Sequence, residues 1–158
     1  MEQAYEQLDD DTKERIEHLT ATHTLRTNFG RRLPPDELEQ KLIDYPDQHH
    51  PVVRVHPVSG WRALFVNGSS VDKIDHIDPD DGRPLLARLI ATASQPNYQV
   101  RFRGRRYSFA MWDNRSTQHR AAQDFGNERR RVERVTLLGE RPFGPARADP
   151  QVPAGAST

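Results

Sequence analysis

Apolar residues in the first part of the chain recur at helical spacing. Ile16, Leu19 and His23 lie three and four residues apart, so they share one face of a helix that we predict over residues 1–23. A second helix is expected to begin at Pro34-Pro35, because proline is favoured in a first helical turn and apolar residues follow on one side.

Residues 51–67 change to the pattern of a β-hairpin. Residues 51–56 are rich in valine, which favours strands, and residues 57–60 read Pro-Val-Ser-Gly, which favours a turn. Residues 61–67 then return as a second strand. This segment predicts the clearest hairpin of the chain.

The second half of the chain predicts one more helix and three strands. A Pro-Asp-Asp-Gly loop at residues 79–82 precedes a helix over residues 83–93, whose apolar face carries three leucines and an isoleucine. The strands are expected near residues 98–103, 109–112 and 132–138. This order does not alternate strand and helix as a doubly wound fold would, so it predicts a mixed α+β fold with antiparallel strands.

The composition separates an ordered part of the chain from a tail. Residues 143–158 are rich in Pro, Ala, Gly and Ser, and we expect them to be disordered. Residues 1–142 then form one domain, in keeping with a length of 158 residues. Apolar residues make up 34% of the chain, which is low against about 45–50% in a typical domain with glycine counted. Either a flexible fraction dilutes the core, or the chain is part of something larger.

Charge and cysteine content narrow the function classes. The chain has 23 basic and 23 acidic residues, so it carries no net charge that would favour nucleic acid or anionic lipid. Arginines cluster at residues 101–106 and 129–131, but acidic residues are interspersed through the chain, and we expect no nucleic-acid partner. Apolar runs are too short to cross a membrane. Because the chain has no cysteine, disulfides and thiolate chemistry are excluded, and a cytoplasmic location is expected.

One of the seven histidines stands near two arginines at suggestive spacing. His119 precedes Arg130 by eleven residues, and Arg134 follows four residues later. On a strand, residues four apart point the same way, so both guanidinium groups would face one side. Arginine binds carboxylate or sulfonate groups through paired hydrogen bonds, so this pattern is compatible with a metal beside two anionic ligands. On spacing alone, a solvated, arginine-rich strand edge is the favoured interpretation.

Four motifs in order resemble one enzyme family. They are the stretches HPVVRVHP at residues 50–57, LFVN at residues 64–67, WDNRSTQH at residues 112–119 and RRVERVTLLGERP at residues 130–142. Together they resemble the C-terminal part of the TauD/TfdA family of Fe(II)- and 2-oxoglutarate-dependent dioxygenases. Taurine dioxygenase, an enzyme of taurine catabolism, typifies this family. The resemblance runs from about Ala4 to Pro142, nearly the whole domain.

The resemblance implies a fold and a set of roles. The family fold is a double-stranded β-helix, or jelly roll, of the clavaminate synthase-like type with helical insertions. His119 would be the distal iron ligand, Arg130 would pair with 2-oxoglutarate, and Arg134 would face the anionic group of the substrate. Asn28 and Phe29 match a segment that lines the substrate pocket. The substrate would be a small sulfonate, sulfate ester or carboxylate, hydroxylated with oxygen.

The family's other two iron ligands have no counterpart here. They form an H-x-D motif well over a hundred residues before the distal histidine, beyond the start of this chain, so half of the barrel is expected to be missing. The motif His76-Ile77-Asp78 has the same spacing but lies only 43 residues before His119, in a loop that precedes a helix. We interpret it as turn and helix-cap chemistry rather than as ligands.

These observations leave two functions open. The chain is either the C-terminal portion of a dioxygenase that an N-terminal half or a second copy completes, or a catalytically inactive remnant or interaction module of the same fold. In both cases the isolated chain is predicted to be inactive, because dioxygenase iron requires three protein ligands.

Overall fold

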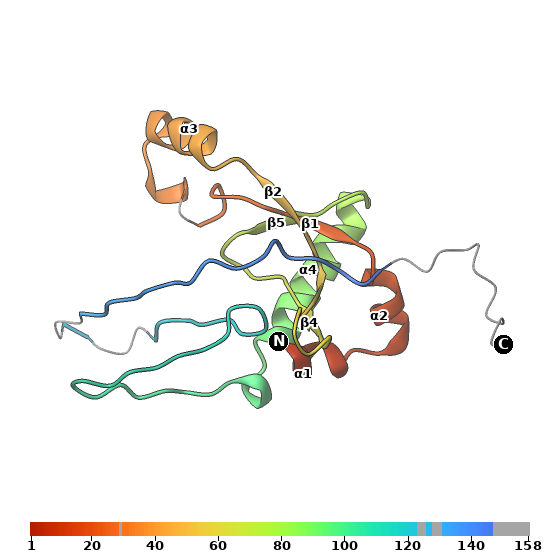
Figure 1. Cartoon of the computed structure of the whole chain (residues 1–158). Helices are drawn as coiled ribbons and strands as arrows, with labels where there is room; N and C mark the ends of the chain where they lie inside the picture. The colour runs from red at the N-terminus through yellow and green to blue at the C-terminus, as the bar shows by residue number, and fades with distance from the viewer. Residues whose placement is uncertain (29, 123–125, 128–130, 147–158) are drawn as a thin grey trace.

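The computed structural model describes residues 1–28, 30–122, 126–127 and 131–146 of the chain. Helices and two small antiparallel sheets gather in one body, and two long extended segments run away from it (Figure 1). We call residues 99–122 the first arm and residues 131–142 the second arm. The mixture of helices and antiparallel strands confirms the mixed α+β class.

The N-terminal segment forms two short helices instead of one long one. Helix α1 spans Glu2–Glu6 and α2 spans Asp10–Ile16, and the Asp9 carboxylate caps α2 by accepting from the Thr12 amide at 2.8 Å. The prediction of one helix over residues 1–23 was therefore wrong. Strand β1, Thr20–His23, follows, because alternating threonines suit a strand and its Ala21 is fully buried.

A three-stranded antiparallel sheet has the order β2-β1-β5. Strand β2 is Gln48–Pro51 and β5 is Val71–Ile74, and β1 lies between them. His49 and His50 lie in β2. Strand β5 was not predicted, because Asp72 and Lys73 interrupt its apolar residues.

The predicted hairpin is confirmed. Strands β3, Val53–Val55, and β4, Arg62–Leu64, pair antiparallel with Val53 opposite Leu64. Gly60 ends the turn with φ of 73°, a left-handed conformation that favours glycine.

The two longer helices differ in how far they are buried. Helix α3, Pro35–Asp44, begins at the expected prolines but buries none of its residues. Helix α4, Pro79–Ala93, begins four residues before the predicted start, because Asp78 accepts from the Asp80 amide and caps it. Single 3₁₀ turns occur at Gly30–Arg32 (η1) and Pro96–Tyr98 (η2).

The core joins α1, α2 and α4 to both sheets. Its fully buried large side chains are Ile16, Val52, Val53, Leu64, Val66 and Leu89. Burial of such side chains is the main stabilising contribution, at about 1.5–3 kcal/mol each relative to exposure.

The two arms hold the residues for which strands were predicted, and that prediction was wrong. No strand is assigned in the described residues after β5. Val100 is 96% exposed and Val135 is 91% exposed, and most other large apolar side chains of the arms are also exposed. The alternation typical of strands is present, but a strand also needs a neighbour to pair its backbone groups, and the arms have none in the described part of the chain. At its end the second arm rejoins the body, where the Val55 amide donates to the Phe143 carbonyl at 2.9 Å.

Within the described residues, no helix is long and apolar enough to cross a membrane.

Candidate metal and anion site

The segment that leads to His119 is folded around Asp113. The Asp113 carboxylate accepts from Arg115 Nη2 at 2.6 Å, from the Arg115 amide at 2.8 Å and from Arg115 Nε at 2.9 Å. His56 Nε2, in the β3–β4 hairpin, lies 3.2 Å from Asp113 Oδ2, the oxygen that also accepts from Arg115 Nη2. The bonds from Arg115, and then that from His56, hold the pKa of Asp113 well below its usual range. The ionised carboxylate therefore ties the first arm to the hairpin.

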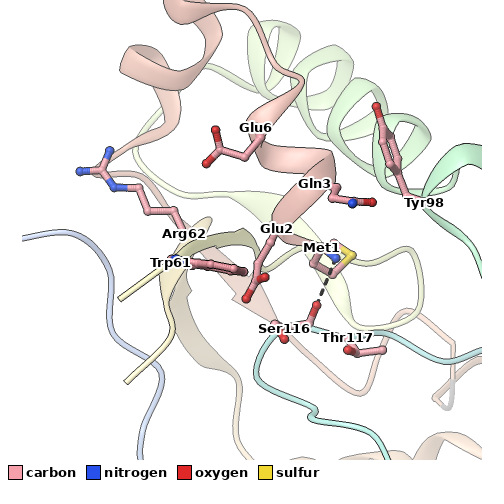
Figure 2. A pocket seen from close by; sticks show the side chains of 9 residues that line it. All are labelled: Met1, Glu2, Gln3, Glu6, Trp61, Arg62, Tyr98, Ser116 and Thr117. Atoms are coloured by element: carbon pink, nitrogen blue, oxygen red, sulfur yellow. Dashed lines mark hydrogen bonds between the residues drawn. The ribbon is translucent and has the colours of Figure 1, made fainter. Parts of the chain in front are cut away.

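Two further contacts attach this segment to the body. Gln118 Nε2 donates to the Val66 carbonyl at 2.6 Å. The amino group of Met1 donates to the Ser116 carbonyl at 3.1 Å, and both residues line a hollow of about 520 Å³ between α1, the hairpin and the first arm (Figure 2). Burial lowers the pKa of this amino group. Ser116 and Gln118, which precede His119, are thus bonded to the body.

His119 and Arg134 meet where the two arms run alongside each other. Arg134 Nη1 lies 3.5 Å from His119 Nε2, and the His119 ring packs at 4.9 Å between centroids against Trp112. Trp112 in turn donates from Nε1 to Asn114 at 2.9 Å. Both His119 and Arg134 are exposed, so the imidazole and the guanidinium present one open surface. A cation beside an imidazole suits an anionic ligand.

The other predicted site residues are Asn28, Phe29 and Arg130, and the structure describes only the first of these. Arg130 and Phe29 lie outside the described residues. Asn28 lies exposed in the turn between β1 and η1, and no described hydrogen bond connects it to His119 or Arg134.

The residues that the structure describes do not complete an iron site. Among the described residues, no group of three or more His, Asp or Glu side chains could hold a metal ion. His76 and Asp78 do not belong to a three-ligand group among the described residues, and the Asp78 carboxylate caps α4. Fe(II) in this enzyme class needs two histidines and a carboxylate, and His119 supplies one imidazole.

The sequence pattern did not predict that Arg54 is buried against the second arm. Arg54 is 6% exposed, stacks at 5.2 Å on the Phe65 ring, and donates to Glu140 of the second arm at 3.1 Å. The sequence does indicate that Arg54 needs a partner, because a charged residue inside an apolar strand is costly to bury without one. The sequence could not show that the partner lies 86 residues away.

Two half-buried histidines contact each other beside the same phenylalanine. The rings of His23 and His50 lie 5.0 Å apart, and His23 stacks on Phe65 at 5.4 Å. Burial and the neighbouring His50 lower the pKa of His23 to about 4. Burial, followed by Arg141 and Arg54, also lowers the pKa of His50. Both rings are therefore neutral near pH 7.

Comparison with known proteins identifies the family. The family model described as "Taurine catabolism dioxygenase TauD, TfdA family" matches residues 1–136. The chain is 37% identical over 148 residues to an alpha-ketoglutarate-dependent sulfate ester dioxygenase of Pseudomonas putida, a match that covers 89% of this chain and 49% of the relative. It is 34% identical to an alkylsulfatase of Acinetobacter baylyi, over 88% of this chain and 46% of the relative. The chain belongs to the TauD/TfdA family, as the resemblance predicted.

Solved structures agree with this assignment. A taurine dioxygenase from Burkholderia xenovorans is 28% identical, with a TM-score of 0.52, and the match covers 66% of this chain and 32% of that one. The enzyme AAD-2, solved in complex with Mn(II) and N-oxalylglycine, is 32% identical with a TM-score of 0.54, over 62% of this chain and 38% of that one. The chain spans about half the length of the two curated relatives compared above.

Proposed function

We propose that this chain supplies the C-terminal part of a 2-oxoglutarate-dependent dioxygenase that hydroxylates a small anionic substrate. The single observation that carries the proposal is the contact between His119 and Arg134 in a member of the TauD/TfdA family. The relatives that act on sulfate esters favour a sulfate ester or sulfonate, and a carboxylate remains within the same class.

The proposal gives each site residue one role. His119 is one imidazole ligand of Fe(II), Arg130 pairs with the distal carboxylate of 2-oxoglutarate, and Arg134 takes the anionic group of the substrate. Asn28 and Phe29 line the substrate pocket. The orientation of His119 depends on Trp112, because an imidazole ligand needs its ring plane held by neighbouring groups.

The remaining iron ligands would come from a polypeptide segment that this chain does not contain. The arms support this part of the proposal, because their backbone is extended and their apolar side chains are exposed. Strands of an N-terminal half that pair with the arms would satisfy the backbone groups and cover these side chains, giving the jelly roll. Fe(II) and 2-oxoglutarate are therefore cofactors of the completed protein, and the isolated chain is inactive.

A second candidate is a catalytically inactive module of the same fold. It is favoured by the lack of a three-ligand group among the residues that the structure describes. In that case the arms would serve only to bind another protein, including a second copy of this chain.

Anaerobic titration with Fe(II) and 2-oxoglutarate tests the proposal on the isolated chain. We expect no visible metal-to-ligand charge-transfer band, because one imidazole does not hold the metal. A band that appears in the natural chain and is lost in His119→Ala would show that the chain completes its own site, and would refute the requirement for a second half. His18→Ala, at an exposed histidine outside the site, is the matched control.

A further inference from the structure

The second arm meets the body in an ion pair with a buried arginine. Arg54 of β3 donates from Nη2 to Glu140 Oε1 at 3.1 Å. The side chain of Arg54 is buried, whereas that of Glu140 is 41% exposed. A buried guanidinium is costly without a partner, so Arg54 favours the one position of the arm in which Glu140 reaches it.

Two backbone features fix the chain directly after this ion pair. The Val55 amide donates to the Phe143 carbonyl at 2.9 Å. A Cβ atom on Gly144 would lie 3.1 Å from Pro51 Cβ and 3.2 Å from the Val53 carbonyl oxygen, so glycine allows this close approach to the sheet. We call residues 140–144 the anchor, because their contacts set where along β3 the second arm joins the body.

The anchor also acts on the first arm. The hydrogen bonds and the charge of Asp113, and then the charge of Glu140, raise the pKa of Arg115. Asp113 is the carboxylate that ties the first arm to the hairpin through His56, at 3.2 Å. Both arms are therefore held at the β3–β4 hairpin by neighbouring groups of alternating charge.

An even spacing along the second arm joins the anchor to Arg134. Arg134 lies six residues before Glu140 on an extended segment, and residues an even number apart on an extended chain point to the same side (Figure 1). The arm therefore presents Glu140 to Arg54, and Arg134 to His119 at 3.5 Å, from one face. A slip of one residue at the anchor would turn Arg134 away from His119.

We propose that Arg54 and Glu140 are positioning residues: their ion pair sets the register of the second arm and so places Arg134 beside His119. The positioning role rests on the proposed function, in which Arg134 takes the anionic group of the substrate and His119 holds the iron. Among the described contacts, neither Arg54 nor Glu140 bonds to Arg134 or His119, so both act through the arm.

A single spin label tests this register on the full chain. Because the chain has no cysteine, Val135→Cys provides one thiol for a nitroxide label, at a 91% exposed position next to Arg134. We expect the label to broaden the ring resonances of His119 in the NMR spectrum. A labelled chain without this broadening would show that the arms do not lie together, and would overturn the proposal.

Variants of the ion pair are then compared in the labelled chain. Arg54→Met combined with Glu140→Gln removes the pair and leaves no buried cation without a partner. This double variant should lose most of the broadening of His119, and the conservative Glu140→Asp should keep more of it. Glu133→Gln is the matched control, because Glu133 pairs with Arg131 on the same arm and both side chains are exposed. It should leave the broadening unchanged.

A purely stabilising ion pair predicts a different result. In that case the double variant lowers the urea midpoint while the broadening of His119 stays as in the natural sequence, and the proposal is overturned. Far-ultraviolet circular dichroism checks that the variants are folded. Glu140→Gln alone, at a partly exposed position, keeps the test valid if the variant at the buried Arg54 is not folded.

The consequence for catalysis is measured with the N-terminal half of the Pseudomonas putida sulfate ester dioxygenase fused ahead of this chain. The double variant should raise KM for an alkyl sulfate about tenfold and change kcat less than about twofold, because a misplaced Arg134 weakens substrate binding. An unchanged KM would overturn the positioning role. If the fusion with the natural sequence releases no succinate, the proposed function fails, and the spin label still decides the register.

Discussion

The contact between His23 and His50 should make this fold sensitive to acid. The burial that lowers the pKa of His23 to about 4 means that the folded state resists protonation of this ring. In the unfolded chain the same ring has a pKa of about 6.5. Between these two values the unfolded state binds more protons, so stability is present above pH 6.5 and is lost as the pH falls toward 4.

The size of the effect follows from this difference. Each pKa unit corresponds to about 1.4 kcal/mol, so lowering the pH from 7 to 5 should reduce the free energy of unfolding by about 2 kcal/mol through His23 alone. His50 adds to the loss in the same direction, because its pKa is also lowered.

Urea denaturation at pH 7 and pH 5 measures this loss. The variant His23→Gln cannot take up the proton, so its free energy of unfolding should fall by about 2 kcal/mol less than that of the natural chain. His18→Gln, at an exposed histidine, should behave like the natural chain. Equal pH dependence in His23→Gln and in the natural chain would refute the reasoning, as would a His23 pKa above 6 measured by NMR.

Three further predictions concern the packing and the site. Leu89→Ala should lower the free energy of unfolding by about 2–5 kcal/mol in urea, because Leu89 is fully buried, whereas Leu138→Ala at an exposed position should change it by less than about 0.5 kcal/mol. Asp113→Asn should cost up to about 1 kcal/mol, because the charged contact with Arg115 is lost but the pair is about one-third exposed and screened by solvent; no change in the urea midpoint would contradict that role. Trp112→Leu should change the NMR shifts of the His119 ring protons by removing the indole ring that packs against them, and Trp112→Phe should change them less.

Local patterns in the sequence predicted elements whose partners are close along the chain. The hairpin of β3 and β4 was predicted because its strands and turn are contiguous, and α3 because proline and apolar spacing are local signals. His23 was assigned to a helix because its spacing from Ile16 also fits helical periodicity, whereas pairing with two distant strands makes it part of β1.

Contacts between distant residues explain what the sequence pattern could not predict. His49 and Asp75 lie 26 residues apart, and Arg54 and Glu140 lie 86 apart, so neither pair leaves a local pattern. The proximity of His119 and Arg134 was suggested by spacing and by the family resemblance together. Apolar and polar residues alternate along the arms as they do in strands, but a strand forms only where a neighbouring strand supplies hydrogen bonds.

A chimeric protein tests the central claim most directly. The N-terminal half of the Pseudomonas putida sulfate ester dioxygenase would be joined ahead of this chain, and succinate release from 2-oxoglutarate would be measured with Fe(II), oxygen and an alkyl sulfate. We predict succinate release by the chimera, its loss in His119→Ala, and none from the isolated chain. Release that survives His119→Ala, or a folded chimera that binds Fe(II) and 2-oxoglutarate but releases no succinate, would contradict the proposal that this chain completes a dioxygenase.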